Sequence, residues 1–391
     1  MSSSFKSTKI ACFIGFVVQA IINNFLPLLF IIFNSKPYNL NYEQLGRLLF
    51  INFFVQLIVD AITPAIVKKT GYRGAAIACH GLAAVGLCLL GILPLMFPDH
   101  IYACLVAAIV VYASGSGIIE VCISPIVELL PGDKKGADMA FSHSFYCWGQ
   151  AFTVLASTLL FFILGQNKWF FVPMLWAIIP FLNMLNFMRV PIIEEHDNSI
   201  GKAANTLLKD RDFWLFAIIM ICAGASEIAM AEWASLFAQK ALGVEKAIGD
   251  LLGPCAFAIC MGSGRVIFGL LDGKFNPKKA LIINNIFCIA CYVGVGVFNI
   301  PTLSLIACAL CGFTVSLSWP GTYSMAARHF PTGGTLMFSI LALCGDFGCS
   351  MGPWLLGIVA NGSTLETGFI VLAVFPAVMV LTASLLHKEK C

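Results

Sequence analysis

Residues 10–33 read IACFIGFVVQAIINNFLPLLFIIF, a stretch in which no side chain carries a charge. About 20 apolar residues in a helix are enough to cross the hydrocarbon core of a bilayer. The stretch contains Pro27, exceeds the length of a signal-peptide core and shows no cleavage site of small residues. We therefore interpret it as a first transmembrane span.

Similar apolar runs follow one another along the whole chain. Of its 391 residues, 59% are hydrophobic and 11% are charged, whereas soluble domains carry roughly 25% charged residues. We therefore expect an all-α membrane protein of the multi-pass type. The runs and their breakers predict twelve transmembrane helices, near residues 9–33, 44–67, 74–97, 101–130, 138–164, 169–190, 212–240, 247–271, 279–299, 302–329, 335–360 and 367–387.

The longest polar stretch, from Glu194 to Arg211, lies in the middle of the chain. We expect it to form a cytoplasmic linker, residues 191–211, between an N-terminal six-helix bundle, residues 1–190, and a C-terminal one, residues 212–391. Most Lys and Arg residues fall on alternate connections, which by the positive-inside rule puts both termini in the cytoplasm. The basic residues behind the net charge of +3 therefore indicate the orientation of the chain in the membrane. They give no reason to expect a nucleic-acid partner.

Two spans share a pattern of glycine and proline. Gly117 and Pro125 stand eight residues apart in span four, as do Gly312 and Pro320 in span ten. The offset is about half of the chain. The pattern indicates two related halves.

The motifs of several other protein classes are missing or misplaced. The 16 cysteines lie mostly inside apolar runs, where cysteine acts as a small hydrophobe, so we expect no disulfides. Cys288-x-x-Cys291 and Cys308-x-x-Cys311 match a zinc spacing, but each pair sits in an apolar helix without polar neighbours, which favours packing over a metal site. There is no phosphate-binding loop and no nucleophile elbow. We expect that the protein is not an enzyme and binds no cofactor.

The spans, the linker and the basic loops together resemble the major facilitator superfamily over essentially the whole chain. Gly264-Arg265-Val-Ile-Phe-Gly-Leu-Leu-Asp272 resembles the second-half copy of that superfamily's loop signature. There, acidic and basic groups hold one conformation closed, which implies a gating role for Arg265 and Asp272. Parallel six-helix repeats are the architecture of these transporters.

In the first half the resemblance is to the fucose:proton symporter family. The run from Lys68 and Lys69 to Arg73 is similar to that family's Lys-Lys and Tyr-basic pairs, and implies that all three residues act in gating. The helix segment from Gly115 to Glu120 is similar to the family's glycine-rich helix with a buried glutamate. The resemblance implies that Glu120 binds substrate and a proton.

Span one departs from the family at the position of a proton-carrying aspartate. Asn23-Asn24-Phe-Leu-Pro27 resembles the family's Asn-Asp-x-x-x-Pro segment, with asparagine where some members have a proton-carrying aspartate. Other carboxyls must then be considered for the proton. An ionisable group within a span costs about 2.5–3.5 kcal/mol and usually faces a cavity or a partner. Glu120, Glu227 and Asp346 are the candidates. For Glu120 and Glu227 the alternative is a structural contact with a neighbouring helix.

A hydroxyl-rich solute needs paired donors and acceptors and a flat apolar face against which it can stack. Amide and indole side chains inside the spans supply both. The predicted substrate-binding residues are Asn23, Asn24, Glu120, Trp148, Gln150, Glu227 and Trp319.

We therefore predict a secondary active transporter that works by alternating access and takes up a sugar or similar small polar metabolite together with protons. The alternative is proton-coupled efflux of hydrophobic organic compounds or drugs, which would need a more aromatic cavity. A solute sensor or receptor is disfavoured because the loops are short. We expect a monomer in the cell membrane whose partners are the solute, the proton and membrane lipid.

Overall fold

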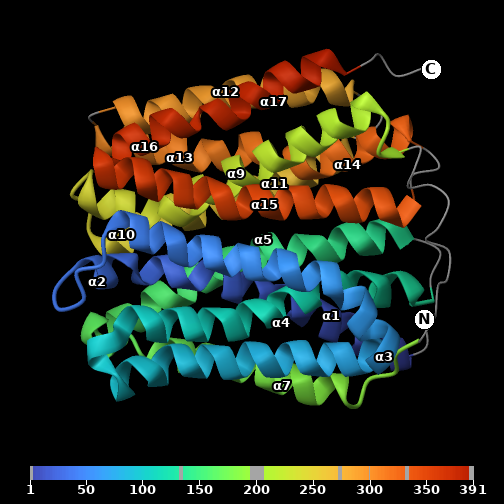
Figure 1. The fold of residues 1–391 in the computed structure, drawn as a ribbon, viewed down its shortest axis with the longest axis horizontal. Helices are drawn as coiled ribbons and strands as arrows, with labels where there is room; N and C mark the ends of the chain where they lie inside the picture. Colours follow the sequence, from blue (N-terminus) through green and yellow to red (C-terminus); the bar gives the residue numbers. More distant parts are fainter. Residues whose placement is uncertain are drawn as a thin grey trace. The chain divides into compact units, whose positions relative to one another are not determined.

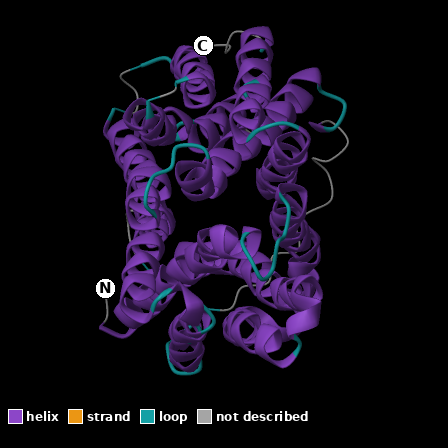
Figure 2. Cartoon of the chain, turned by 90° about the vertical axis from the view of Figure 1, so that its left-hand side faces the viewer, coloured by secondary structure: helices purple, strands orange, loops and turns teal. Residues whose placement is uncertain are grey.

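A computed structural model describes residues 3–131, 135–193, 207–271, 275–298, 300–330 and 334–386. In these ranges every regular element is a helix (Figure 2). The elements are α1 (Ser3–Phe25), η1 (Leu26–Leu29), α2 (Phe30–Asn34), α3 (Tyr42–Met96), η2 (Pro98–His100), α4 (Ile101–Leu129), α5 (Lys135–Leu164), η3 (Gln166–Lys168), α6 (Phe171–Trp176), α7 (Ile178–Phe187), α9 (Arg211–Lys240), α10 (Lys246–Asp250), η4 (Leu251–Cys255), α11 (Ala256–Leu270), α12 (Pro277–Val297), α13 (Pro301–Val315), α14 (Ser318–His329), α15 (Gly334–Gly362), α16 (Leu365–Leu372) and α17 (Val374–Leu385).

Ten helical segments among the described residues are long and apolar enough to cross a membrane. One of them, Tyr42–Met96, covers two of the expected spans, and Gly71 at φ 69° and ψ 170° interrupts its helical conformation. The segment Phe171–Phe187 is apolar but shorter than the ten. The all-helical, multi-pass architecture is thus confirmed, whereas the count of twelve stays a prediction.

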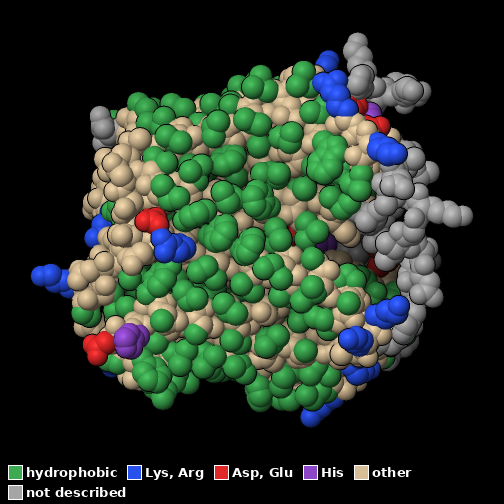
Figure 3. Space-filling view, in the orientation of Figure 1, with side chains coloured by type: hydrophobic (Ala, Val, Ile, Leu, Met, Phe, Trp, Pro, Cys, Tyr) green, Lys and Arg blue, Asp and Glu red, His purple; other side chains and the backbone are tan. Residues whose placement is uncertain are grey.

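The outer surfaces of these helices are apolar. Large hydrophobic side chains such as Leu159, Phe162 and Ile163 on α5 are 58%, 80% and 66% exposed. On the face shown in Figure 3, hydrophobic side chains cover most of the surface, and most of the visible Lys and Arg lie toward its edges. Because a helix satisfies its own backbone hydrogen bonds, such a surface is stable against lipid.

Contacts divide the chain into two compact units. Unit 1 comprises Met1–Leu40 and Ile51–His196, and unit 2 comprises Asn41–Phe50 and Asp197–Cys391. The first turns of α3 thus belong to unit 2, where Gly46 packs closely on α15: a Cβ added there would lie 3.1 Å from the oxygen of Pro353. In unit 1, α1 packs on α4 and α5.

In unit 2, α9 packs along α15 and α17, and α12 packs along α17 (Figure 1). Small residues bring α9 and α15 close together. A Cβ at Gly352 would lie 2.7 Å from the Cα of Ala225, and one at Gly348 would lie 3.0 Å from the nitrogen of Ala225. Close backbone approach of this kind is typical of helix packing in membranes, where the hydrophobic effect cannot drive association.

The two glycines of the sequence repeat have matching surroundings within their own units. A Cβ at Gly117 would lie 2.9 Å from the oxygen of Gln56, and one at Gly312 would lie 2.9 Å from the carbonyl carbon of Phe257. The helices differ at the following proline. Pro125 lies inside the continuous α4, whereas the chain breaks between α13 and α14, just before Pro320.

Candidate functional site

Unit 1 contains a buried cluster of amides joined by hydrogen bonds. Gln56 of α3 donates from Nε2 to Oδ1 of Asn23 of α1 at 2.8 Å, and Asn52 donates to the same oxygen at 3.3 Å. Ser116 of α4 donates to Oε1 of Gln56 at 2.8 Å. All four residues are at most 5% exposed. Buried polar groups cost free energy unless they are paired, so these contacts fix the three helices relative to one another.

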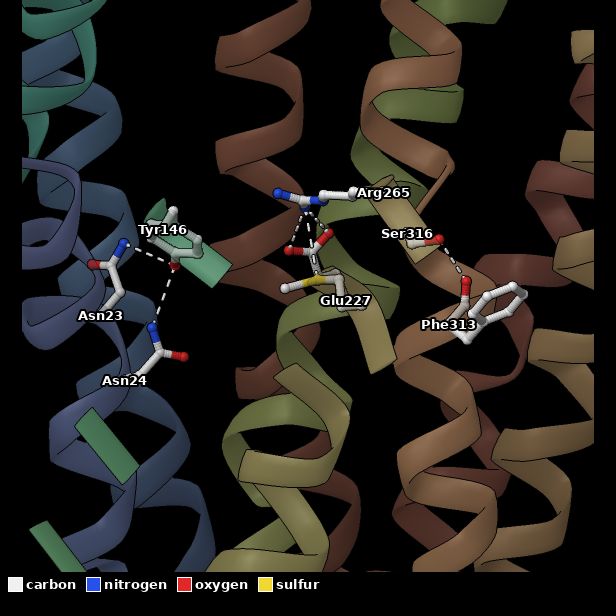
Figure 4. A network of polar contacts seen from close by, with 8 residues as sticks. Asn23, Asn24, Tyr146, Glu227, Arg265, Phe313 and Ser316 are labelled. Atoms are coloured by element: carbon white, nitrogen blue, oxygen red, sulfur yellow. Dashed lines mark hydrogen bonds and ion pairs between the residues drawn. The ribbon is translucent and has the colours of Figure 1, made fainter. Parts of the chain in front are cut away.

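Tyr146 of α5 extends this cluster. Its hydroxyl lies 3.5 Å from the Nδ2 atoms of both Asn23 and Asn24, and the three side chains point toward one another in Figure 4. Asn24 also donates from Nδ2 to the oxygen of Ala20, one turn earlier in α1, at 2.9 Å. The expected pair of asparagines in span one therefore does converge on one phenol.

A carboxyl lies one turn away from the cluster. Gln19 of α1 donates a hydrogen bond from Nε2 to Oε2 of Glu120 on α4. Gln19 precedes Asn23 by four residues, and Glu120 follows Ser116 by four. Residues four apart share one face of a helix. Gln19 and Asn23 therefore lie on one face of α1, and Ser116 and Glu120 lie on one face of α4.

Unit 2 contains a charged pair within its spans. Both carboxylate oxygens of Glu227 on α9 lie 3.3 Å from Nη2 of Arg265 on α11 (Figure 4). The same nitrogen lies 3.7 Å from the sulfur of Met261, one turn earlier in α11. A buried charge is tolerated when it is paired, which explains how the spans can hold both residues.

The remaining predicted binding and proton residues lie in different surroundings. Gln150 of α5 is 2% exposed, whereas Trp148 is 43% exposed on the surface of unit 1. The ring of Trp319 on α14 covers Gly345 of α15 and lies 6.1 Å from the ring of Tyr323. Asp346 is partly buried on α15. Their roles in binding and coupling stay predictions.

The predicted gating residues are also dispersed. Lys68 and Lys69 are exposed just before the break in α3. Arg73 donates from Nη1 to the oxygen of Phe187 at 2.8 Å and from Nη2 to the oxygen of Val190 at 2.9 Å, so it caps the C-terminal end of α7. Asp272 lies outside the described residues. Arg265 lies beside Glu227, although its motif predicted a gating role.

The four cysteines with zinc-like spacing lie on the neighbouring helices α12 and α13. The sulfur atoms of Cys288 and Cys311 are 3.8 Å apart. Among the residues that the structure describes, no group of three or more His, Cys, Asp or Glu side chains is arranged to hold a metal ion. The pair fits close packing between two apolar helices.

Five residues of the unit 1 cluster were not predicted from the sequence, because neither a charge nor a family motif marks them as binding residues. A signal was present, however. Amides and hydroxyls recur at four-residue spacing within apolar runs, as Gln19 with Asn23 and Asn52 with Gln56, and such spacing places them on one helix face. The residues missed are Gln19, Asn52, Gln56, Ser116 and Tyr146.

The fold and these interior groups define a polytopic α-helical membrane protein with polar contacts buried in each unit. Residues 10–353 match the model of the Major Facilitator Superfamily. The chain belongs to this superfamily of transporters, and the resemblance inferred from its motifs is confirmed.

The chain is similar to known proteins over most of its length, in sequence to one and in fold to others. The membrane protein MosC of Rhizobium meliloti is 23% identical over 335 residues, covering 84% of this chain and 77% of MosC. The crystal structure of a variant of the E. coli fucose:proton symporter FucP matches with a TM-score of 0.69, 17% identity and coverage of 98% and 100%. The xylose transporter XylE from E. coli, in a partially occluded inward-open conformation, matches with a TM-score of 0.80, 14% identity and coverage of 100% and 99%.

Proposed function

We propose that the protein is a secondary active transporter that takes up a sugar or similar small polar metabolite together with protons by alternating access. The observation that carries this proposal is the amide and hydroxyl cluster of Asn23, Gln56, Ser116 and Tyr146 in unit 1. A sugar offers several hydroxyls, each able to donate and accept, and amides supply both functions at fixed positions. The similarity in fold to symporters named for fucose and xylose supports the same solute class.

Glu120 would link the solute to the proton. An ionised carboxylate only accepts hydrogen bonds, whereas a protonated carboxyl also donates one. Protonation of Glu120 would therefore change what the Gln19–Glu120 contact offers to a solute hydroxyl. A proton and a solute that each favour the other's binding are coupled reciprocally. Glu227 and Asp346 are the further candidates for carrying a proton.

The proposal includes the arrangement expected from the sequence. Twelve spans would form two six-helix halves, residues 1–190 and 212–391, joined by residues 191–211. Both termini would face the cytoplasm, because Lys and Arg concentrate in the loops on that side. The protein would act as a monomer in the cell membrane, in contact with the solute, the proton and lipid.

Efflux of hydrophobic compounds is the alternative use of the same fold. An efflux cavity would be lined mainly by aromatic side chains. Buried amides from α1 and α3 favour a hydroxylated solute instead, because its hydroxyls can both donate to and accept from amide groups, whereas an apolar compound can do neither. Transport of a panel of sugars distinguishes the two uses.

The experiment is uptake of labelled sugars into proteoliposomes with and without an inward acid gradient. Glu120→Gln is compared with Glu128→Gln, a matched control that changes an exposed carboxyl on the same helix, α4. We expect gradient-stimulated uptake that survives in Glu128→Gln and is lost in Glu120→Gln. Absence of uptake for every sugar under both conditions would overturn the symporter proposal and favour efflux.

A further inference from the structure

The charged pair of unit 2 lies within two of its apolar helical segments. Glu227 is near the middle of α9, and Arg265 lies beside the break between α13 and α14 (Figure 4). Gly264 makes this position possible, since a Cβ there would lie 2.8 Å from the Cβ of Ser316 at the break. The lack of a side chain at Gly264 thus lets α11 pack closely against the end of α13, and from there the Arg265 side chain reaches Glu227 of α9.

The contact between the two residues is loose for an ion pair. Charge-assisted N–H···O contacts are usually about 2.7–2.9 Å long, and arginine binds carboxylates best through two parallel bonds. Here one nitrogen, Nη2, faces both oxygens of Glu227 at 3.3 Å. The Arg265 side chain is 23% exposed, whereas that of Glu227 is 6% exposed. The side chain of Arg265 is thus more accessible than that of Glu227.

The charge balance of the pair restricts what can join it. Arg265 and Glu227 together are neutral, and an uncompensated charge within a span is costly. An anion bound alone to Arg265 would leave one negative charge in excess. A proton bound alone to Glu227 would remove the negative charge that Arg265 faces and leave one positive charge in excess. An anion and a proton bound together restore neutrality, so each favours the binding of the other.

We propose that the transported solute carries a carboxylate, as a uronic or aldonic acid does, and that Arg265 binds this carboxylate while Glu227 takes up an accompanying proton. The inference rests on the proposed uptake of a sugar-like metabolite and narrows its substrate class. The planar fork of arginine matches a carboxylate in geometry and in charge. The solute's carboxylate takes the place of Glu227 at the guanidinium, and protonated Glu227 stays buried without charge.

The test compares acid and neutral sugars of otherwise similar shape. Glucose with glucuronate and galactose with galacturonate are supplied to proteoliposomes under an inward acid gradient, and binding is measured by thermal stabilisation in detergent. We expect the acid of at least one pair to accumulate about tenfold or more above its neutral parent, the difference that a contact to a charged group supplies. Arg265→Gln should lose this preference.

Two further variants separate coupling from folding. Glu227→Gln should lose stimulation by the acid gradient but keep exchange of internal for external acid sugar, because Arg265 still binds the carboxylate. The double variant Arg265→Gln with Glu227→Gln lacks both charges of the pair, so neither is left uncompensated. It should fold but fail to bind the acid. Arg47→Gln is the matched control, since Arg47 pairs with Glu43 at a more exposed position on α3, and should keep full uptake of the acid.

The outcomes distinguish this proposal from the one on which it rests. Gradient-driven uptake of neutral sugars without uptake or competition by their acids would overturn the carboxylate proposal and leave sugar symport standing. An unchanged preference for the acid in Arg265→Gln would overturn the assignment of Arg265. Uptake of neither member of any pair would overturn both proposals.

Discussion

Gln56 of α3 stands between Asn23 of α1 and Ser116 of α4, donating to the first and accepting from the second, each at 2.8 Å. Gln56→Leu should therefore deprive the buried side chains of Asn23 and Ser116 of a hydrogen-bond partner. We expect it to lower the free energy of unfolding by about 1–2 kcal/mol. Solute uptake should fall as well, because Asn23 loses its orientation. Unfolding in mixed micelles and uptake into proteoliposomes measure the two effects.

Ser114→Ala is the control for this variant. Ser114 lies on α4 and donates to the oxygen of Val110 in the same helix, so its loss should leave both measurements nearly unchanged. Equal stability of Gln56→Leu and the unaltered protein would show that the cluster does not join the three helices.

Arg73 is expected to stabilise unit 1. Its guanidinium donates to the oxygens of Phe187, Met188 and Val190, so Arg73→Ala should reduce the free energy of unfolding by about 1–2 kcal/mol. Lys69→Ala, at an exposed position, should change it by no more than about 0.5 kcal/mol. If Arg73→Ala alters only the rate of uptake and not unfolding, the gating role predicted from its motif would be favoured over capping.

The interface of α9 and α15 should tolerate no added volume at Gly348. A Cβ there would lie 2.8 Å from the carbonyl carbon of Ile221 and 3.0 Å from the nitrogen of Ala225. Gly348→Ala must push the helices apart and should cost about 1–3 kcal/mol of stability. Gly362→Ala, near the end of the same helix and with no atom within 4 Å of its Cβ, is the control. Similar melting temperatures of the two variants would contradict the close contact.

Gly71 should resist replacement for a conformational reason. Its φ of 69° and ψ of 170° fall in a region that is essentially restricted to glycine, and other residues pay about 1–3 kcal/mol to occupy it. Gly71→Ala should lower stability by an amount in this range. A melting temperature that does not change would show that the chain can reverse between the two parts of α3 without this conformation.

Much of the fold could be predicted because the bilayer imposes simple rules. The expected span 212–240 corresponds to α9 (Arg211–Lys240), and residues 10–33 lie within the apolar segment Phe5–Asn34. Length and hydropathy were sufficient in both cases. The π-helical turn Leu251–Cys255 and the break after Val315 were not predicted. Local geometry of this kind depends on neighbouring helices, which periodicity does not reveal.

The candidate site was only partly predictable. Glu227 and Arg265 were both singled out, but for different roles, and nothing in their spacing of 38 residues indicates that they meet. Their pairing depends on how α11 packs against α13, which itself contacts α9, and this tertiary packing is not visible in the sequence. The amides of α3 give a weaker signal in the sequence, because an uncharged polar residue in an apolar run costs less free energy than a charge and so indicates a functional site less strongly.

The hydrogen bonds of the unit 1 cluster have a direction that can be reversed as a whole. They run from Ser116 through Gln56 and Asn23 toward Tyr146, and the residues at both ends carry hydroxyls. An amide turned by 180° exchanges its donor and acceptor, and a hydroxyl can serve as either. Asn52, which also donates to Asn23, must turn with them. The cluster can then present either a lone pair or a proton at the Tyr146 end, so the proposed uptake of a sugar predicts that epimers with opposite hydroxyl orientation are both accepted.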